Sequence, residues 1–180
     1  MTTAIVFDTE TTGLTKPEGT PLGQQPQIIE ICCIKLDDDL NEIDSYETFI
    51  NPGKPIDDEI TSITGITNED VCNAPKFEEI YADLAGFFLG TEILVAHNLP
   101  FDRNLLSYEL RRMDKLRNFP WPIHHMCTIN KAQKLFGYRI KLGDLYKEAT
   151  GKDHAKAHRA RGDVEATIEC FTWLANKGVL

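Results

Sequence analysis

The order of apolar segments along this chain predicts an α/β domain in which helices flank one mixed sheet of five strands. Three segments with strand character follow one another closely near the N-terminus, and strands then alternate with helical patterns. Close spacing favours antiparallel hairpins, and the later alternation favours helices layered on a sheet. Of the 180 residues, 42% are hydrophobic and 26% charged, which is ordinary for a globular protein. We therefore expect residues 1–180 to form a single domain.

The first three strands are expected at residues 4–7, 27–36 and 43–50, as an antiparallel meander. The first is a short apolar run, the second is mostly apolar and rich in β-branched side chains, and the third alternates. Three prolines and two glycines indicate a loop at residues 15–26, between the first two strands. A run of aspartates at residues 37–39 supplies the polar turn before the third strand.

Helical signals dominate the remainder of the chain. A short helix at residues 57–64 is expected to end at Gly65, and Thr67 with Asp70 resembles a capping box that begins the next helix. Apolar side chains recur at helical spacing over residues 76–89. The other strands are expected at 93–96 and 123–127, and the other helices at 101–112, 129–136, 142–149 and 160–176.

The composition narrows the class of protein. No apolar run approaches the roughly 20 residues that cross a membrane, and no basic flank with a long apolar stretch begins the chain. The five cysteines form no C-x-x-C pair, so we expect free thiols rather than disulfides or a zinc site. Free thiols are typical of the reducing cytoplasm, which is the expected location, and no membrane association is expected.

Charge is distributed unevenly in this chain, whose net charge is −9. Residues 1–102 carry 4 basic against 20 acidic side chains, whereas residues 103–180 carry 15 against 8. The second half can therefore face a polyanion, with the Arg and Lys residues between 103 and 161, Arg159 and Arg161 among them, as candidates to hold phosphates. On charge alone, the simpler interpretation is a solvated helix face. The overall acidity argues against a tight, non-specific binder of duplex nucleic acid.

Asp8 and Glu10 follow the first apolar run and precede a Thr-Thr-Gly turn. Side chains two apart on a strand point the same way, so these carboxylates are expected side by side. Such a pair is unfavourable unless one member binds a proton or both bind a cation, and we favour the cation. Acidic pairs in loops are usually only solvated. This pair, however, leaves the carboxyl end of a central strand, where α/β folds bind ligands.

A second polar group follows the fourth strand, where His97 and Asn98 precede Asp102 in the first turn of a helix. An aspartate at that position also complements the helix dipole, and taken alone helix capping is the simpler interpretation. His97 and Asn98 can likewise hydrogen-bond the corner between strand and helix. The alternative is that these side chains face a substrate.

A third group contains His158 and Asp163, at the start of the terminal helix. Five helical residues rotate by roughly 140° net at about 3.6 residues per turn, so both side chains reach one site only if His158 precedes the helix. His154 and His158 also have the i, i+4 spacing of a metal-binding pair. No nearby acidic or cysteine partner is visible for that pair, which we do not favour.

With these three groups the chain resembles the DEDDh family of 3′–5′ exonucleases, which includes replicative proofreading subunits and oligoribonucleases. The family's motifs are matched in order by residues 8–14, by residues 97–98 with 101–102, and by residues 158–163. The third motif, H-x-A-x-x-D, selects His158 over His154, because only His158 has an aspartate, Asp163, five residues later. The resemblance covers nearly the whole chain.

The resemblance implies a ribonuclease H-like sheet on which Asp8, Glu10, Asp102 and Asp163 converge on two divalent cations, Mg²⁺ or Mn²⁺. Two such ions would compensate four clustered carboxylates, and they would hold the attacking and leaving oxygens of an in-line displacement. His158 would remove a proton from the attacking water, since imidazole titrates near neutral pH. The implied reaction releases nucleoside 5′-monophosphates from the 3′ end of single-stranded nucleic acid.

The resemblance also implies substrate contacts around the turn after Glu10. Backbone groups at Thr11 would meet the terminal hydroxyl, Leu14 and Phe101 would flank the last bases, and His97 and Asn98 are weaker candidates. Core packing is the alternative role for Leu14 and Phe101. DNA is favoured over RNA, while proofreading, repair and RNA turnover all stay open, as do a polymerase or repair partner and the oligomeric state.

Two other functions are kept as alternatives. A haloacid-dehalogenase-like phosphatase also begins with an apolar strand, followed by D-x-D-x-T, but here the second acid is Glu10 and the remaining catalytic set is not found. A catalytically inactive nucleic-acid-binding or scaffolding module would have lost a carboxylate or the histidine, and all five are present. A metal-dependent exonuclease is therefore the favoured function.

Overall fold

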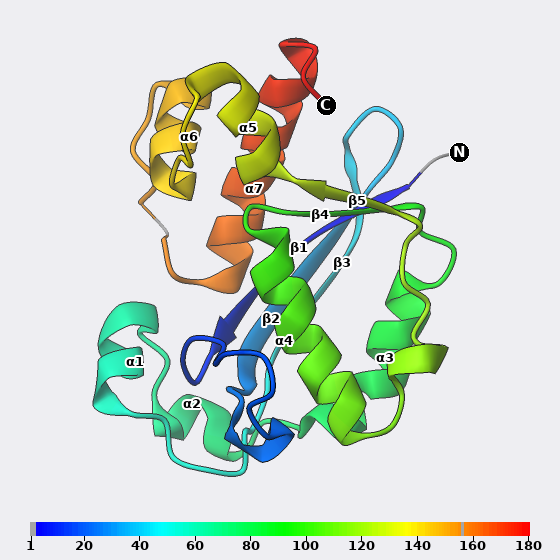
Figure 1. Cartoon of the computed structure of the whole chain (residues 1–180), viewed down its shortest axis with the longest axis vertical. Coiled ribbons are helices and arrows are strands. Elements are labelled where there is room, and N and C mark those ends of the chain that lie inside the picture. The colour runs from blue at the N-terminus through cyan, green and yellow to red at the C-terminus, as the bar shows by residue number, and fades with distance from the viewer. Residues whose placement is uncertain (1–2, 156) are drawn as a thin grey trace.

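The computed structural model describes residues 3–155 and 157–180, and its strands form a five-stranded sheet in the order β3-β2-β1-β4-β5. Figure 1 shows this sheet running through the centre of the molecule with helices on either side. The strands are β1 (Ala4–Thr11), β2 (Ile28–Leu36), β3 (Glu42–Phe49), β4 (Ile93–Ala96) and β5 (His124–Cys127). The predicted α/β fold with a five-stranded sheet is confirmed.

The first three strands form the predicted antiparallel meander. β1 pairs with β2 from Ala4 opposite Leu36 to Thr11 opposite Ile28, and β2 pairs with β3. β4 is parallel to β1, and β5 is parallel to β4. The sheet is therefore mixed, and the carboxyl ends of β1, β4 and β5 lie at the same edge of it.

Helices cover both faces of the sheet. They are α1 (Asp58–Thr64), α2 (Asn68–Cys72), α3 (Phe77–Phe88), α4 (Leu99–Arg112), α5 (Thr128–Phe136), α6 (Leu142–Thr150) and α7 (Ala160–Asn176), with short 3₁₀ helices at Leu22–Gln24 and Leu116–Asn118. α3 and α4 enclose a core with Ile5 and Phe7 of β1. α7 encloses the opposite core with Ala4 and Val6. Side chains of β1 thus alternate between the α4 face and the α7 face.

Two element boundaries differ from the expectation in an informative way. β1 continues to Thr11, beyond the apolar run, because its polar residues keep their ladder with β2. α4 begins at Leu99 rather than at residue 101, because Pro100 occupies its first turn, where a missing N–H is tolerated. The capping box of Thr67 with Asp70 and the left-handed Gly65 after α1 are confirmed.

The five cysteines are free, four of them buried and Cys72 exposed. Burial raises the pKa of Cys32 to about 12 and that of Cys33 well above its ordinary value, so these two thiols stay protonated core groups. Among the described residues, no helix combines the length and the apolar character that crossing a lipid bilayer requires.

Candidate active site

Asp8 and Glu10 lie within β1 rather than beyond its end, on the face that α7 covers. Both share the direction of Val6, which packs in the α7 core. In the ladder with β2, Asp8 stands opposite Cys32 and Glu10 opposite Glu30, just before an irregularity in the pairing. The two carboxylates are therefore directed to one side, as the sequence predicts, although the strand continues past them.

Thr9 points to the other face of β1 and holds Asp102 of α4. Its backbone N–H and its hydroxyl both donate to Asp102 Oδ1, at 3.1 and 2.8 Å. Asp102 is in the first turn of α4 and is 3% exposed. Helix capping alone does not explain this side chain, because it is bonded to a strand 93 residues away in sequence.

Asp163 lies in the first turn of α7 and is buried. Its Oδ1 is 2.5 Å from Nε2 of His154, and its Oδ2 accepts the backbone N–H of His158 at 3.0 Å. A carboxylate oxygen has two lone pairs, so each oxygen keeps one for a further partner. Asp163 is thus oriented by the segment that precedes its own helix.

The two histidines of that segment occupy different places. His158 lies before α7, as expected, with an exposed side chain and a left-handed φ of 65°. One of its ring nitrogens lies within 4.8 Å of carboxylate oxygens of Glu10 and Asp163. The ring of His154 is instead buried against Asp163 and Tyr146. The turn folds this ring back onto Asp163, an acidic partner that was not visible from the sequence.

The acidic groups meet in one cavity of about 230 Å³ at the carboxyl-terminal edge of the sheet. They reach it from β1, α4 and α7, three elements that are distant in sequence. Eight residues of the predicted site line it, and Thr11 and Leu14 do not. The complete lining is Asp8, Thr9, Glu10, His97, Asn98, Phe101, Asp102, Leu142, His158 and Asp163.

Burial makes ionisation of these carboxyl groups unfavourable. Burial, reinforced by the charges of Asp102 and Asp163, raises the pKa of Asp8 well above its ordinary value. Burial and the charge of Asp163 raise the pKa of Glu10 to about 8. Burial also raises the pKa of Asp102 to about 7, against the two hydrogen bonds from Thr9. These groups therefore retain protons near neutral pH unless a cation replaces them.

The donor set suits divalent cations that prefer oxygen ligands. Carboxylate oxygens are the protein ligands favoured by Mg²⁺ and Mn²⁺. Glu10, His158 and Asp163 each offer one ligand atom within 4.8 Å of the others. The residues that are present thus fit a divalent metal site.

His97 lies at the corner between β4 and α4, and its ring makes hydrogen bonds there. Its Nδ1 is 2.8 Å from the hydroxyl of Thr128, and its Nε2 is 3.2 Å from the carbonyl oxygen of Ile140. Burial lowers the pKa of His97 to about 4, so the ring is neutral and donates through Nε2. Hydrogen bonds at this corner, one of the two predicted roles, therefore account for both ring nitrogens of His97. Asn98, which lines the cavity, accepts a hydrogen bond from Arg139 at 3.3 Å.

A second cavity of about 500 Å³ lies beside the carboxylates, between the turn after β1 and helix α1. Leu14 lines it and is 81% exposed, which excludes core packing for this side chain. Phe101 packs against the core and also lines both cavities, so its two proposed roles are compatible. Thr11 lines the second cavity too, and its hydroxyl donates to the carbonyl oxygen of Gly13 within the turn.

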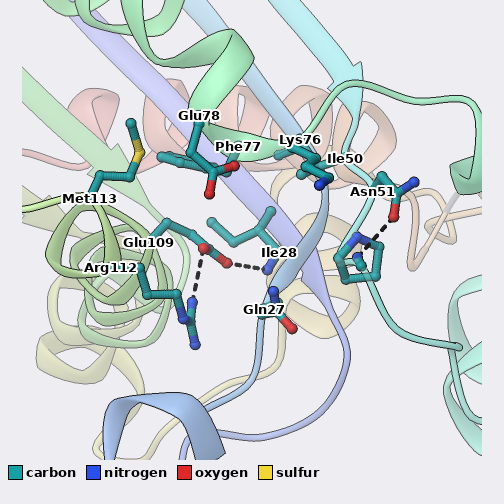
Figure 2. A pocket seen from close by; sticks show the side chains of 12 residues that line it. Gln27, Ile28, Ile50, Asn51, Lys76, Phe77, Glu78, Glu109, Arg112 and Met113 are labelled. Carbon is teal, nitrogen blue, oxygen red and sulfur yellow. Dashed lines mark hydrogen bonds and ion pairs between the residues drawn. The ribbon is translucent and has the colours of Figure 1, made fainter.

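Glu109 and Arg112 of α4 anchor the segment between β1 and β2. Buried Glu109 accepts the backbone N–H of Ile28 at 3.0 Å and pairs with Arg112 at 2.9 Å (Figure 2). Arg112 in turn donates to the carbonyl oxygens of Leu22, Gln25 and Pro26. The helix that carries Asp102 therefore also fixes the base of the turn that carries Leu14.

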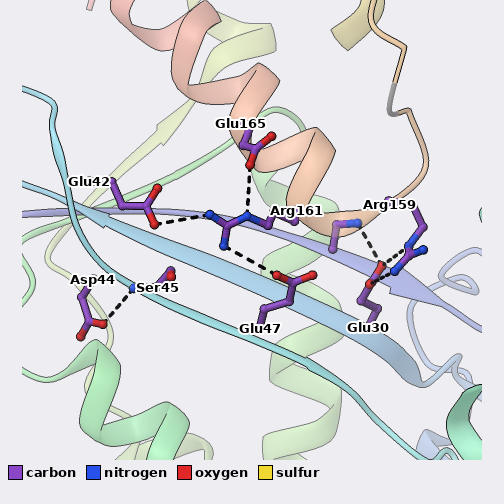
Figure 3. Close-up of polar contacts among 9 residues, drawn as sticks. Glu30, Glu42, Asp44, Ser45, Glu47, Arg159, Arg161 and Glu165 are labelled. Atoms are coloured by element: carbon purple, nitrogen blue, oxygen red, sulfur yellow. Dashed lines mark hydrogen bonds and ion pairs between the residues drawn. The ribbon is translucent and has the colours of Figure 1, made fainter.

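Arg159 and Arg161 are engaged by acidic side chains of this chain (Figure 3). The partner of Arg159 is Glu30, at 2.9 Å. The partners of Arg161 are Glu42, Glu47 and Glu165, at 3.5, 3.7 and 3.1 Å. The structure therefore does not support these two arginines as the holders of substrate phosphates.

Three residues that shape the site were given no role in it from the sequence. Thr9 has a readable signal, since the residue between two acids on a strand must face the opposite layer. Glu30 is a charged residue inside the apolar segment of β2, which is also a signal. His154 carried only its spacing from His158, and the turn that brings it to Asp163 has no local signature.

Comparisons with known proteins agree with this geometry. The family model described as exonuclease (RNase_T) matches residues 5–171. A PolC-type DNA polymerase III of Thermotoga petrophila is 33% identical over 169 residues, which are 94% of this chain but only 12% of that protein. The DNA polymerase III subunit epsilon of Treponema pallidum is 34% identical over 172 residues, covering 92% of this chain and 73% of that protein.

A solved structure shows the same fold. The nuclease domain of 3′hExo, described as a DEDDh family member bound to rAMP, superposes with a TM-score of 0.79 at 19% identity, over 98% of this chain and 93% of that one. The chain thus belongs to the DEDDh-type 3′–5′ exonuclease family and has its ribonuclease H-like fold. This family uses divalent metal ions. The phosphatase alternative is thereby excluded.

Proposed function

We propose that this chain is a metal-dependent 3′–5′ exonuclease that hydrolyses the terminal phosphodiester of single-stranded nucleic acid, with DNA favoured, and releases nucleoside 5′-monophosphates. The observation that carries the proposal is the meeting of four carboxylates and His158 in one cavity at the edge of the sheet. Membership of the exonuclease family supports the same reaction class.

Two Mg²⁺ or Mn²⁺ ions are the proposed cofactor, with Asp8, Glu10, Asp102 and Asp163 as their ligands. The raised pKa values of Asp8, Glu10 and Asp102 support this assignment, because bound cations take the place of the retained protons. When bound, the ions stabilise the negative charge that develops on the phosphate oxygens.

His158 is the proposed general base. Its exposed ring lies close to Glu10 and Asp163, where it can accept a proton from a water molecule. The oxygen of that water attacks the terminal phosphorus, and the bond from phosphorus to the 3′ oxygen breaks. The leaving oxygen takes a proton and becomes the new 3′-hydroxyl of the shortened strand. Asp163 holds the backbone of His158 in place through its Oδ2.

The strand is proposed to cross the site between two surfaces of different character. Leu14 and Phe101 offer apolar contacts to the last bases. Such contacts do not distinguish one base from another. On the other side, a groove of about 720 Å³ continues past Asn98 and is lined by Arg139 and Lys141. We propose that these two side chains hold phosphates, rather than Arg159 and Arg161 at the start of α7.

DNA as the substrate and a DNA polymerase as the partner are proposals that draw on the relatives, whose names are those of DNA polymerase III proteins. A cytoplasmic location is proposed with them, and the five free thiols support it.

The test is hydrolysis of a 5′-labelled single strand by the purified protein, in Mg²⁺ or Mn²⁺ and in EDTA. A ladder of shortened products that EDTA abolishes is expected, and matched DNA and RNA strands establish the preference. Asp8→Ala and Asp163→Ala should each lose at least about 100-fold in rate. Asp38→Asn, an exposed acid in the β2–β3 turn, is the matched control and should stay within twofold, roughly the scatter of a surface substitution.

A folded wild-type protein that binds the strand but yields no ladder would overturn the proposal and support the catalytically inactive binding module. Calorimetry with Mn²⁺ separates the two functions further, since the inactive module has no need for a cation at the carboxylates.

A further inference from the structure

Glu30 is a buried acid that belongs to no part of the proposed reaction. It lies in β2 among isoleucines, is 2% exposed, and does not line the carboxylate cavity. A buried carboxylate is unfavourable by several kcal/mol unless it is paired and hydrogen-bonded. The groups that bond Glu30 therefore indicate which part of the fold it supports.

Within the described part of the chain, the partners of Glu30 are Arg159, the N-cap of α7, and Ala160, its first residue (Figure 3). Oε1 accepts from Arg159 Nη2 at 2.9 Å, and Oε2 accepts from Arg159 Nε at 3.4 Å. Oε2 also accepts the backbone N–H of Ala160 at 3.0 Å, and Ala160 is fully buried. One side chain of the sheet thus holds both the guanidinium and the first helical amide.

The start of α7 depends on this contact. Arg159 is the N-cap residue and makes no capping bond with its own side chain. The first amides of a helix have no partner within the helix, and a negative charge at that end is favourable. Glu30 supplies the acceptor and the charge from another element, as a cap that the local sequence lacks.

Arg159 and Ala160, which Glu30 holds, lie between the two active-site residues of this segment, His158 and Asp163. His158 precedes Arg159 directly, and the amide of Asp163 bonds the Arg159 carbonyl oxygen at 3.0 Å. His158 has a left-handed backbone, which is uncommon for a residue other than glycine and needs support from its surroundings. Glu30 also stands opposite Glu10 in the sheet. The contact therefore sets how far His158 and Asp163 lie from β1.

From this arrangement we infer that Glu30 is a positioning residue, which clamps the start of α7 so that His158 and Asp163 face Asp8 and Glu10. Glu30 is not among the proposed metal ligands, because it does not line the carboxylate cavity and its side chain is bonded to Arg159 and to the amide of Ala160. The kinetic consequence rests on the proposed function, whereas the effect on the backbone of residues 153–163 does not.

The experiment compares Glu30→Gln with wild type by hydrogen exchange and by kinetics. Glutamine keeps the shape and one acceptor but loses the charge that holds Arg159. In the metal-free protein, amides of residues 157–163 should exchange about tenfold faster. On a 5′-labelled DNA strand, kcat should fall about tenfold or more, while KM and the affinity for Mn²⁺ change by less than about threefold.

Glu47→Gln is the matched control. Glu47 also joins the sheet to α7, through Arg161 at 3.7 Å, but both side chains are more than a third exposed. An exposed ion pair contributes little, so exchange and kcat should stay within about twofold of wild type. Arg159→Gln is the second variant, because its half-exposed side chain can be replaced without a cavity. The changes in exchange and in kcat of Arg159→Gln should lie between wild type and the values expected for Glu30→Gln. This variant tests the inference even if Glu30→Gln does not fold.

Wild-type exchange and wild-type kcat in folded Glu30→Gln, or in Arg159→Gln if only that variant folds, would overturn the inference. So would a loss of Mn²⁺ affinity as large as the loss of kcat, which would make Glu30 part of the metal site. Equal effects in Glu47→Gln would reduce the clamp to general stability. If wild type shows no nuclease activity, the proposed function fails, and the exchange comparison alone still decides the role of Glu30.

Discussion

Replacing Glu10 by glutamine should stabilise the metal-free protein at alkaline pH while weakening its response to metal. Glu10 has a pKa raised from 4.5 to about 8, first by burial and then by the charges of Asp163, Glu30 and Asp102. Without a cation, ionisation of this group therefore opposes folding. Glutamine has nearly the same shape and carries no charge, so it removes that opposition.

The sign and the size of this change in stability follow from the linkage between proton binding and folding. Below about pH 4.5, Glu10 is protonated in both states and the substitution has no electrostatic effect. Between pH 4.5 and about 8 the unfolded chain releases the proton while the folded chain keeps it, so the stability of wild type falls as pH rises. The interval of about 3.5 pH units, 8 minus 4.5, corresponds to an upper limit of about 5 kcal/mol.

Partial exposure of Glu10 and relaxation of the cavity reduce this limit, and we expect about 2 kcal/mol at pH 9. Urea denaturation of the wild type and Glu10→Gln in EDTA, at pH 4.5 and pH 9, measures the difference. At pH 9 the variant should also melt about 4–8 °C higher, whereas the two proteins should coincide at pH 4.5. Exposed Glu18→Gln is the control and should show no such dependence.

Adding Mn²⁺ should reverse the difference in stability, so that wild type becomes more stable than Glu10→Gln. At about 100 times its dissociation constant, a ligand stabilises the folded state by about 2.7 kcal/mol, and wild type should gain this while Glu10→Gln gains less. A stability difference in EDTA that does not change between pH 4.5 and pH 9 would refute the electrostatic reasoning. A variant that is less stable than wild type at pH 9 would refute it as well.

His158→Ala should lower kcat at least about 100-fold and leave the Mn²⁺ affinity within about threefold, as measured by single-strand hydrolysis and by calorimetry; full activity at neutral pH would remove His158 as the base. Thr9→Val deletes the hydroxyl donor to Asp102 and should lower stability by about 1 kcal/mol in urea denaturation at pH 9, with Thr9→Ser restoring it. Arg139→Gln combined with Lys141→Gln should flatten the slope of log Kd against log salt for single-stranded DNA by about 1.4, and an unchanged slope would place the phosphates elsewhere.

Much of this fold can be read from local patterns, because local patterns report burial and chain stiffness. The period of two in β1 sends Asp8 and Glu10 to one face, and Gly65 after α1 and the Thr67 capping box mark helix ends that the structure repeats. The three acidic motifs could also be placed at strand ends and helix starts from sequence alone. These features depend only on residues a few positions apart.

The partners of the site residues depend on how α4 and α7 dock on opposite faces of the sheet, and no local pattern encodes that docking. Packing of α4 brings Asp102 to Thr9 across 93 positions. Packing of α7 carries Arg159 to Glu30. The turn before it brings the ring of His154 to Asp163 Oδ1, while His158 donates its backbone N–H to Oδ2. Sequence spacing therefore identified the charged groups of this site. The partners that they bond were decided by the layers that bury them, since a buried charge must bond whatever the packing brings within reach.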